Sequence, residues 1–182
     1  MHNPINTSKS LVAVSAIGAY EPNVAGEITQ TFLKCECDIK ESRFSVMGDR
    51  FLLMALLAGN WNAIAKIETA LARLGQRLDL TFVAHRASEK IRSERHLPYI
   101  MEVVTTQNRK LVHEVVRFFE LQKVDIEELH SGDYVAMHTK SAMLSLQLTI
   151  SVPPEISISS FRSDFVDFCD QLNIDAVLEP AK

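Results

Sequence analysis

Residues that build disulfide frameworks and metal centres are scarce in this chain. Its 182 residues include three cysteines, and a single residue separates Cys35 from Cys37. Three thiols cannot form a fully paired framework, and an odd number is typical of a reducing compartment, so we expect structural thiols in a cytoplasmic protein. No histidine pair has a metal-binding spacing such as H-E-x-x-H. Because a zinc centre needs four ligands, Cys35 and Cys37 alone predict no metal site, and we expect no cofactor.

Long hydrophobic runs and an excess of basic residues are also missing. The longest strongly apolar run, Phe51 to Ala58, is too short to cross about 30 Å of hydrocarbon, and the polar N-terminus lacks the apolar segment of a signal peptide. The formal net charge is −4. Non-specific affinity for nucleic acid comes mostly from lysine and arginine, so this charge argues against direct DNA binding. We therefore expect neither a membrane nor a nucleic acid among the partners.

Common catalytic motifs are absent as well. The sequence has no G-x-S-x-G elbow, no G-x-x-x-x-G-K-[ST] phosphate-binding loop and no G-x-G-x-x-G turn after a strand. A small enzyme would need such a residue set, so we expect a protein without catalytic activity.

An internal repeat is the most informative feature that the chain does contain. An offset of 87 positions aligns two segments without a gap and keeps the chemical type of every matched pair. The matched residues are Val24, Glu27, Ile28, Phe32, Asp38, Ile39 and Glu41 in the first copy, and Leu111, Glu114, Val115, Phe119, Asp125, Ile126 and Glu128 in the second. Both copies thus place a D-I-x-E motif after an amphipathic helix, and we expect two copies of one fold.

Hydrophobic periodicity predicts the same order of elements in each copy. The first copy gives a strand at 10–17, a helix at 24–37, strands at 37–46 and 50–59, a helix at 60–75 and a strand at 78–85. The second gives strands at 98–105, 125–132, 143–152 and 175–179, with helices at 111–122 and around 161–172. This β-α-β-β-α-β order predicts an α+β fold of two ferredoxin-like domains, each an antiparallel sheet with helices on one face. We place the domains at 8–86 and 96–180, with a linker at 87–95.

Two further local features can be read from the sequence. Asn60 or Asn62 is expected to cap the start of the second helix, and Gly75 its end. The hairpin of the second copy, at about 130–142, is longer than that of the first. Such a loop either makes specific contacts or is a tolerated insertion.

The turn between the first strand and the first helix, Gly18 to Asn23, is the candidate site. A helix N-terminus presents unpaired N–H groups and partial positive charge, so a carboxylate docks there readily, and Gly18 lets the backbone approach closely. Pro22 suits the first helical position, because that position needs no N–H donor. A purely structural turn also uses glycine and proline, so the pattern leaves both interpretations open.

A tandem pair of such units with a G-x-x-x-P turn after the first strand resembles the ACT family of small-molecule-sensing regulatory domains. Segments 10–23, 35–51 and 56–68 resemble more narrowly the two-ACT regulators of glycine cleavage genes, and N-W-N-A-I at 60–64 is the specific element. The resemblance implies a transcriptional regulator that contacts a LysR-type activator and binds a small amino acid such as glycine, which relieves repression. The implied ligand-binding residues are Gly18, Ala19, Tyr20, Glu21, Pro22, Asn23 and Val24.

The candidate turn departs from the usual ACT pattern, G-x-D-x-P-G, at two positions. Tyr20 stands where the aspartate would pair with a ligand's ammonium group, and Glu21 is the available substitute. Asn23 stands in place of the second glycine, and asparagine tolerates the left-handed conformation well. The second-copy turn at 105–111 has neither glycine nor proline. It is either structural or a weaker polar site formed by Gln107, Asn108 and Arg109.

The sequence therefore predicts a regulatory protein that acts through protein contact, because an acidic chain without a helix-turn-helix has no direct route to DNA. The alternative is an interaction or scaffold module that has lost ligand binding, favoured by the missing aspartate and the degenerate second turn. Edge strands invite pairing, so we expect the two copies to pack with each other or a homodimer to form through ACT pairing.

Overall fold

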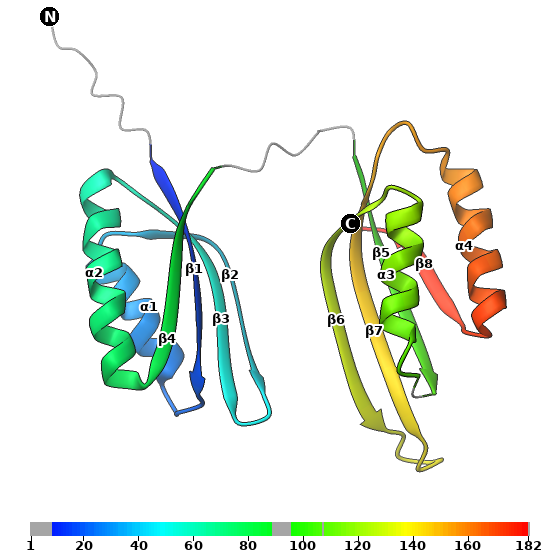
Figure 1. Ribbon diagram of the computed structural model, residues 1–182, viewed down its shortest axis with the longest axis horizontal. Helices are drawn as coiled ribbons and strands as arrows, with labels where there is room; N and C mark the ends of the chain where they lie inside the picture. Colours follow the sequence, from blue (N-terminus) through cyan, green and yellow to red (C-terminus); the bar gives the residue numbers. More distant parts are fainter. Residues whose placement is uncertain (1–8, 89–95, 107, 182) are drawn as a thin grey trace, which may run out of the picture. The chain divides into compact units, whose positions relative to one another are not determined.

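The computed structural model describes residues 9–88, 96–106 and 108–181 of the chain. The chain divides into two compact units, Met1–Ile91 and Arg92–Lys182. Both units have the element order β-α-β-β-α-β (Figure 1). This order confirms the predicted α+β fold class.

The first unit is a four-stranded antiparallel sheet with the strand order β2-β3-β1-β4. Its two helices lie against the same face of the sheet (Figure 1). The elements are β1 (Ser10–Ala19), α1 (Val24–Lys34), β2 (Asp38–Met47), β3 (Arg50–Gly59), α2 (Trp61–Leu78) and β4 (Leu80–Ala87).

The second unit repeats this arrangement with the strand order β6-β7-β5-β8. The elements are β5 (Leu97–Thr106), α3 (Leu111–Leu121), β6 (Asp125–Val135), β7 (Ala142–Val152), α4 (Ile158–Leu172) and β8 (Ala176–Pro180). Most of the predicted long hairpin at 130–142 is strand, because β6 and β7 pair as far as Val135 and Ala142. The residues between the two strands are therefore only 136–141.

The core of each unit forms between the sheet and its two helices. Apolar residues at alternate strand positions and at helical spacing meet there, as the periodicity predicts. In the first unit they include Val12, Val14 and Ala16 of β1 with Val24, Ile28 and Phe32 of α1. The second unit has a cluster of aromatic rings in its core, including Phe118, Phe119, Phe161 and Phe165.

The repeated D-I-x-E motif forms a β-bulge in both units. Where β2 pairs with β3, Ile39 and Glu41 face consecutive residues of β3, so Lys40 is the extra residue of the bulge. Where β6 pairs with β7, Glu127 takes the same place before Glu128. A bulge bends a strand and increases its twist, so the motif shapes the same sheet edge in both units.

The predicted caps of α2 are half right. Asn60 caps its start, since its side chain accepts the N–H of Ala63 at 2.8 Å. The prediction for Gly75 is wrong, because α2 continues past it and ends at Asp79 in the left-handed conformation, with φ 52°. A Cβ at Gly75 would lie 2.6 Å from the carbonyl oxygen of Leu80. Glycine is needed here so that α2 and β4 can pack closely.

Candidate functional site

The candidate turn of the first unit is a tight β-turn on the surface. The N–H of Val24 donates to the carbonyl oxygen of Glu21 at 3.2 Å and closes the turn over Pro22 and Asn23. Asn23 has φ 71° and ψ 1°, which match the third position of a type II turn, and proline suits the second. The left-handed conformation that the sequence allowed for Asn23 is therefore present, in a position that glycine usually takes.

The predicted placement of Pro22 at the first helical position is wrong. α1 begins at Val24 and Asn23 is its N-cap, so Pro22 lies before the helix. Its fixed φ of about −65° serves the turn instead. The proline thereby helps to set the angle at which the chain enters α1.

Two backbone N–H groups at the N-terminus of α1 are available to hydrogen-bond a ligand. The Asn23 side chain makes no capping bond, and the Glu27 N–H makes the first intrahelical bond, to the carbonyl oxygen of Asn23 at 3.1 Å. The N–H groups of Ala25 and Gly26 have no acceptor within the described part of the chain. A carboxylate bound at this end of the helix would meet both donors and the positive end of the helix dipole.

Glycine is needed at position 18 because β1 packs closely against the start of β4. It pairs with Leu80 across β1 and β4. A Cβ at Gly18 would lie 2.4 Å from the carbonyl oxygen of Asp79 and 2.4 Å from Cδ2 of Leu80. The space beside this glycine is therefore filled by the chain itself. Gly75 makes room for the same segment from the side of α2.

The other residues of the turn differ in their surroundings. The N–H of Tyr20 donates to the carbonyl oxygen of Asp49 at 3.0 Å, which fastens the turn to the β2–β3 hairpin. The Tyr20 side chain is 51% exposed, and Glu21 is exposed. Ala19 is half-buried, whereas Val24 is buried in the core. Side chains able to face a ligand in solution are thus those from Tyr20 to Asn23.

The corresponding turn of the second unit has a different geometry. The side-chain Oδ1 of Asn108 accepts the N–H of Lys110 at 3.0 Å, and the backbone carbonyl oxygen of Asn108 accepts the N–H of Leu111 at 3.2 Å. Lys110 has φ −91° and ψ −18°, as in a type I turn, so no left-handed residue is needed. Arg109 is exposed, and Gln107 lies outside the described residues. Asn108 is thus used to shape the turn.

The cysteines are buried thiols. Cys35 and Cys37 are each 7% exposed, and Sγ of Cys37 lies 3.8 Å from the carbonyl oxygen of Ala63. Burial raises the pKa of both thiols, which keeps them protonated and poor as metal ligands or nucleophiles. Among the residues that the structure describes, no group of three or more His, Cys, Asp or Glu is arranged to hold a metal ion. None of the helices in these same ranges has the length and apolar character needed to span a membrane.

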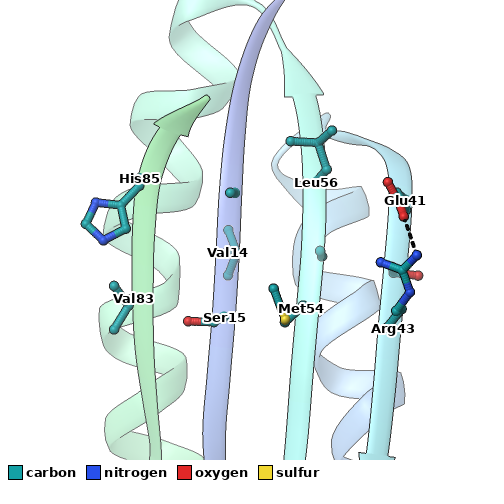
Figure 2. A pocket seen from close by; sticks show the side chains of 11 residues that line it. Val14, Ser15, Glu41, Arg43, Met54, Leu56, Val83 and His85 are labelled. Carbon is teal, nitrogen blue, oxygen red and sulfur yellow. Dashed lines mark ion pairs between the residues drawn. The ribbon is translucent and has the colours of Figure 1, made fainter. Parts of the chain in front are cut away.

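One surface of the first unit was not predicted from the sequence, and we call it the open face. It is the face of the first sheet opposite α1 and α2, and it carries the outward side chains of Met54, Leu56 and Val83 (Figure 2). By strand register, Ile17 and Leu52 lie on the same face. The signal for it was the unbroken apolar run of β3, since a strand that is covered on one face usually alternates.

A shallow groove of about 290 Å³ lies on the open face. Met54 and Val83 line it, and the groove is mostly apolar (Figure 2). The ion pair of Glu41 and Arg43, 2.8 Å between Oε1 and Nη2, stands at the β2 edge, and His85 at the β4 edge. The open face therefore combines an apolar floor with a charged rim, which is typical of a binding surface.

Known protein sequences are similar to this chain over one unit or over most of its length. The ACT domain family matches residues 10–85, which include nearly all of the first unit's strands and helices. The glycine cleavage system transcriptional repressor of Escherichia coli (strain K12) is 29% identical over 167 residues, which cover 92% of this chain and 88% of that protein. The repressor of the same name from Shigella flexneri has the same identity and coverage.

Two solved structures share the fold over nearly the whole chain. One is described as a glycine cleavage system transcriptional repressor, with a TM-score of 0.70 at 20% identity, and covers 96% of this chain and 99% of its own. An unknown protein from Galdieria sulphuraria has a TM-score of 0.80 at 16% identity and covers 96% and 100%. At these identities the likeness shows the fold alone. The ACT match thus lies in the first unit, the second unit repeats the same topology, and the chain as a whole is similar to the glycine cleavage system transcriptional repressors.

Proposed function

We propose that this chain is a non-catalytic regulator of the transcription of glycine cleavage genes. The observation that carries the proposal is the 29% identity to a glycine cleavage system transcriptional repressor over 92% of the chain. The acidic net charge of −4 favours action through another protein over direct contact with DNA. The partner in this proposal is a DNA-binding activator of the LysR type in the cytoplasm.

The proposal includes a small amino acid, with glycine as the first candidate, as the ligand of the first turn. The N–H groups of Ala25 and Gly26 would receive its carboxylate. The exposed carboxylate of Glu21 would receive its ammonium group, in the absence of the usual aspartate. Gly26 is exposed, and a Cβ at this position would meet nothing within 4 Å, so no other side chain covers this side of the first helical turn.

The ligand is tested by thermal unfolding of the full chain against each of the twenty amino acids. A ligand at a hundredfold excess over its Kd stabilises the folded state by about 2.7 kcal/mol, and should raise Tm accordingly. Glu21→Gln removes the proposed ammonium partner and should reduce the shift, whereas Glu155→Gln, an exposed glutamate of the second unit, should leave it unchanged. No shift with any amino acid at millimolar concentration would refute the sensing role.

The partner is tested separately by capture from the native cytoplasm with the full chain as bait. We expect a LysR-type DNA-binding protein, which should then bind in purified form and be released by glycine. Recovery of no DNA-binding regulator contradicts the transcriptional role, whatever the outcome with amino acids.

A second candidate function is an interaction module that has lost its ligand. Tyr20 in place of the aspartate and the packing contact of Gly18 with Leu80 favour it. Partner binding without any amino-acid response identifies this alternative. In either case, a homodimer formed through ACT pairing is part of the proposal.

A further inference from the structure

The two units differ clearly on one sheet face. On the open face, the outward residues of the central strand β3 are Leu52, Met54 and Leu56. By strand register, the equivalent residues of β7 in the second unit are Ser145, Gln147 and Thr149. The same fold thus carries three apolar side chains at these positions in one unit and three polar ones in the other.

The polar outward residues of β7 in the second unit are suited to contact with water. The Gln147 side chain donates to Glu102 at 2.9 Å, and β7 alternates apolar and polar residues, as expected for a strand covered on one face. β3 is apolar at consecutive positions, which is typical of strands buried on both faces.

The open face is nevertheless uncovered by the first unit's own helices. Met54 is 67% exposed, Ile17 50% and Val83 44%. Exposed apolar patches of this kind on a soluble protein mark interaction sites. The composition of β3 therefore indicates that a binding partner covers the open face.

A second copy of this chain offers a matching surface of adequate size. A face four strands wide, at about 4.8 Å per strand, and about 33 Å long has an area of roughly 600 Å². Two such faces in contact remove roughly 1,200 Å² from water, which lies at the lower end of stable interfaces. Stacked sheets interdigitate their side chains, and the flexible thioether of Met54 adapts well to such packing.

The charges at the rim also suit self-association. Glu41 and Arg43 lie together on β2, so the rim carries both signs. A two-fold axis between the sheets and perpendicular to the strands sets β2 of one copy over β2 of the other in the opposite direction. Arg43 of each copy then faces Glu41 of the other. A strongly acidic or basic partner would instead oppose one of these two charges.

We propose that the open face of the first unit packs against the open face of a second copy, forming a two-fold symmetric dimer. The open face is then the surface of the homodimer included in the proposed function, on which this inference rests. Such a dimer differs from pairing through the exposed edge strand β2, because it uses the apolar face of the sheet and leaves the backbone of β2 free of intermolecular pairing.

Sedimentation equilibrium of the full chain across a micromolar dilution series tests the proposal. The key variant combines Met54→Gln with Leu56→Thr, which are the residues that the second unit carries at equivalent positions. The fold tolerates them there, so we expect the variant to fold and to dimerise at least about tenfold more weakly. Val104→Thr, a matched apolar-to-polar change at a 52% exposed position of the second unit's sheet, should leave the dimer unchanged.

The association states of the native chain and of the two variants test separate parts of the proposal. A chain that stays monomeric at every concentration overturns both the homodimer and the open-face inference. A dimer that the double variant leaves intact, or that Val104→Thr weakens as much, overturns the open-face inference alone and points to β2 edge pairing or another surface. An unchanged Tm for the variants verifies that altered association does not reflect unfolding.

Discussion

Replacing Gly18 by alanine should destabilise the first unit, although the change adds a single methyl group. The new Cβ would lie 2.4 Å from the carbonyl oxygen of Asp79 and 2.4 Å from Cδ2 of Leu80, where real contacts are longer than 3.0 Å. The Leu80 side chain is able to turn aside, but the carbonyl belongs to the backbone, so β1 and β4 must separate. Overpacking of this kind costs about 1–3 kcal/mol, and we expect the upper part of that range.

Gly26→Ala is the matched control for this prediction. Its Cβ would meet nothing within 4 Å, and the residue lies inside α1. Alanine is favoured over glycine in helices by about 1 kcal/mol, so this change should stabilise the unit by roughly 0.5–1 kcal/mol. The same chemical substitution is therefore expected to have opposite signs at the two glycines.

Urea unfolding followed by far-UV circular dichroism measures both effects. The fluorescence of Trp61 is not suitable for this purpose, because the single tryptophan of the chain is already 76% exposed in the folded state. With a slope of about 1–3 kcal/mol per molar urea, Gly18→Ala should lower the midpoint by roughly 1 M. A midpoint equal to that of the native chain would refute the close approach of β1 and β4. If amino-acid binding were lost at unchanged stability, Gly18 would serve the ligand and not the packing.

Two substitutions and one titration test other contacts of the fold. Asn60→Ala should cost about 1 kcal/mol in urea unfolding because it removes the α2 cap, whereas Asn62→Ala should change stability little. Gly75→Ala should cost about 1–3 kcal/mol in the same assay, since its Cβ would meet the backbone of β4, and a neutral result would contradict that contact. Burial raises the pKa of Cys169 from 9.0 to about 11. The unfolded chain therefore loses this proton first, and stability should fall between these pH values relative to Cys169→Ala; parallel pH profiles would argue against it.

The architecture could be predicted because its signals are local and repeated. The helical spacing of Val24, Ile28 and Phe32 identifies α1, and the offset of 87 positions shows the same pattern in the second unit. The Asn60 cap was equally accessible, because a capping side chain and its N–H partner lie three residues apart. Periodicity carries such information without any knowledge of the tertiary structure.

The candidate site was predicted less completely, because part of its geometry depends on distant residues. The turn's location and the left-handed Asn23 follow from the residues of the turn itself. The position of Pro22 does not, because the sequence leaves open whether the helix begins at the proline or after it. The contact of Gly18 with Leu80 joins residues far apart in the chain, and nothing in the turn's sequence indicates it.

What the sequence alone determined is the element order, the duplication and the shape-forming residues of the first turn, since each depends on neighbours along the chain. The reason for glycine at positions 18 and 75 is seen only in the tertiary structure. There, β1 and α2 pack around Leu80, and a Cβ at either position would collide with the start of β4. The tertiary structure also decided which face of the first sheet its helices cover. The apolar run of β3 was visible from the start, but its outward half became a candidate interface only when the structure showed Met54 facing away from the core.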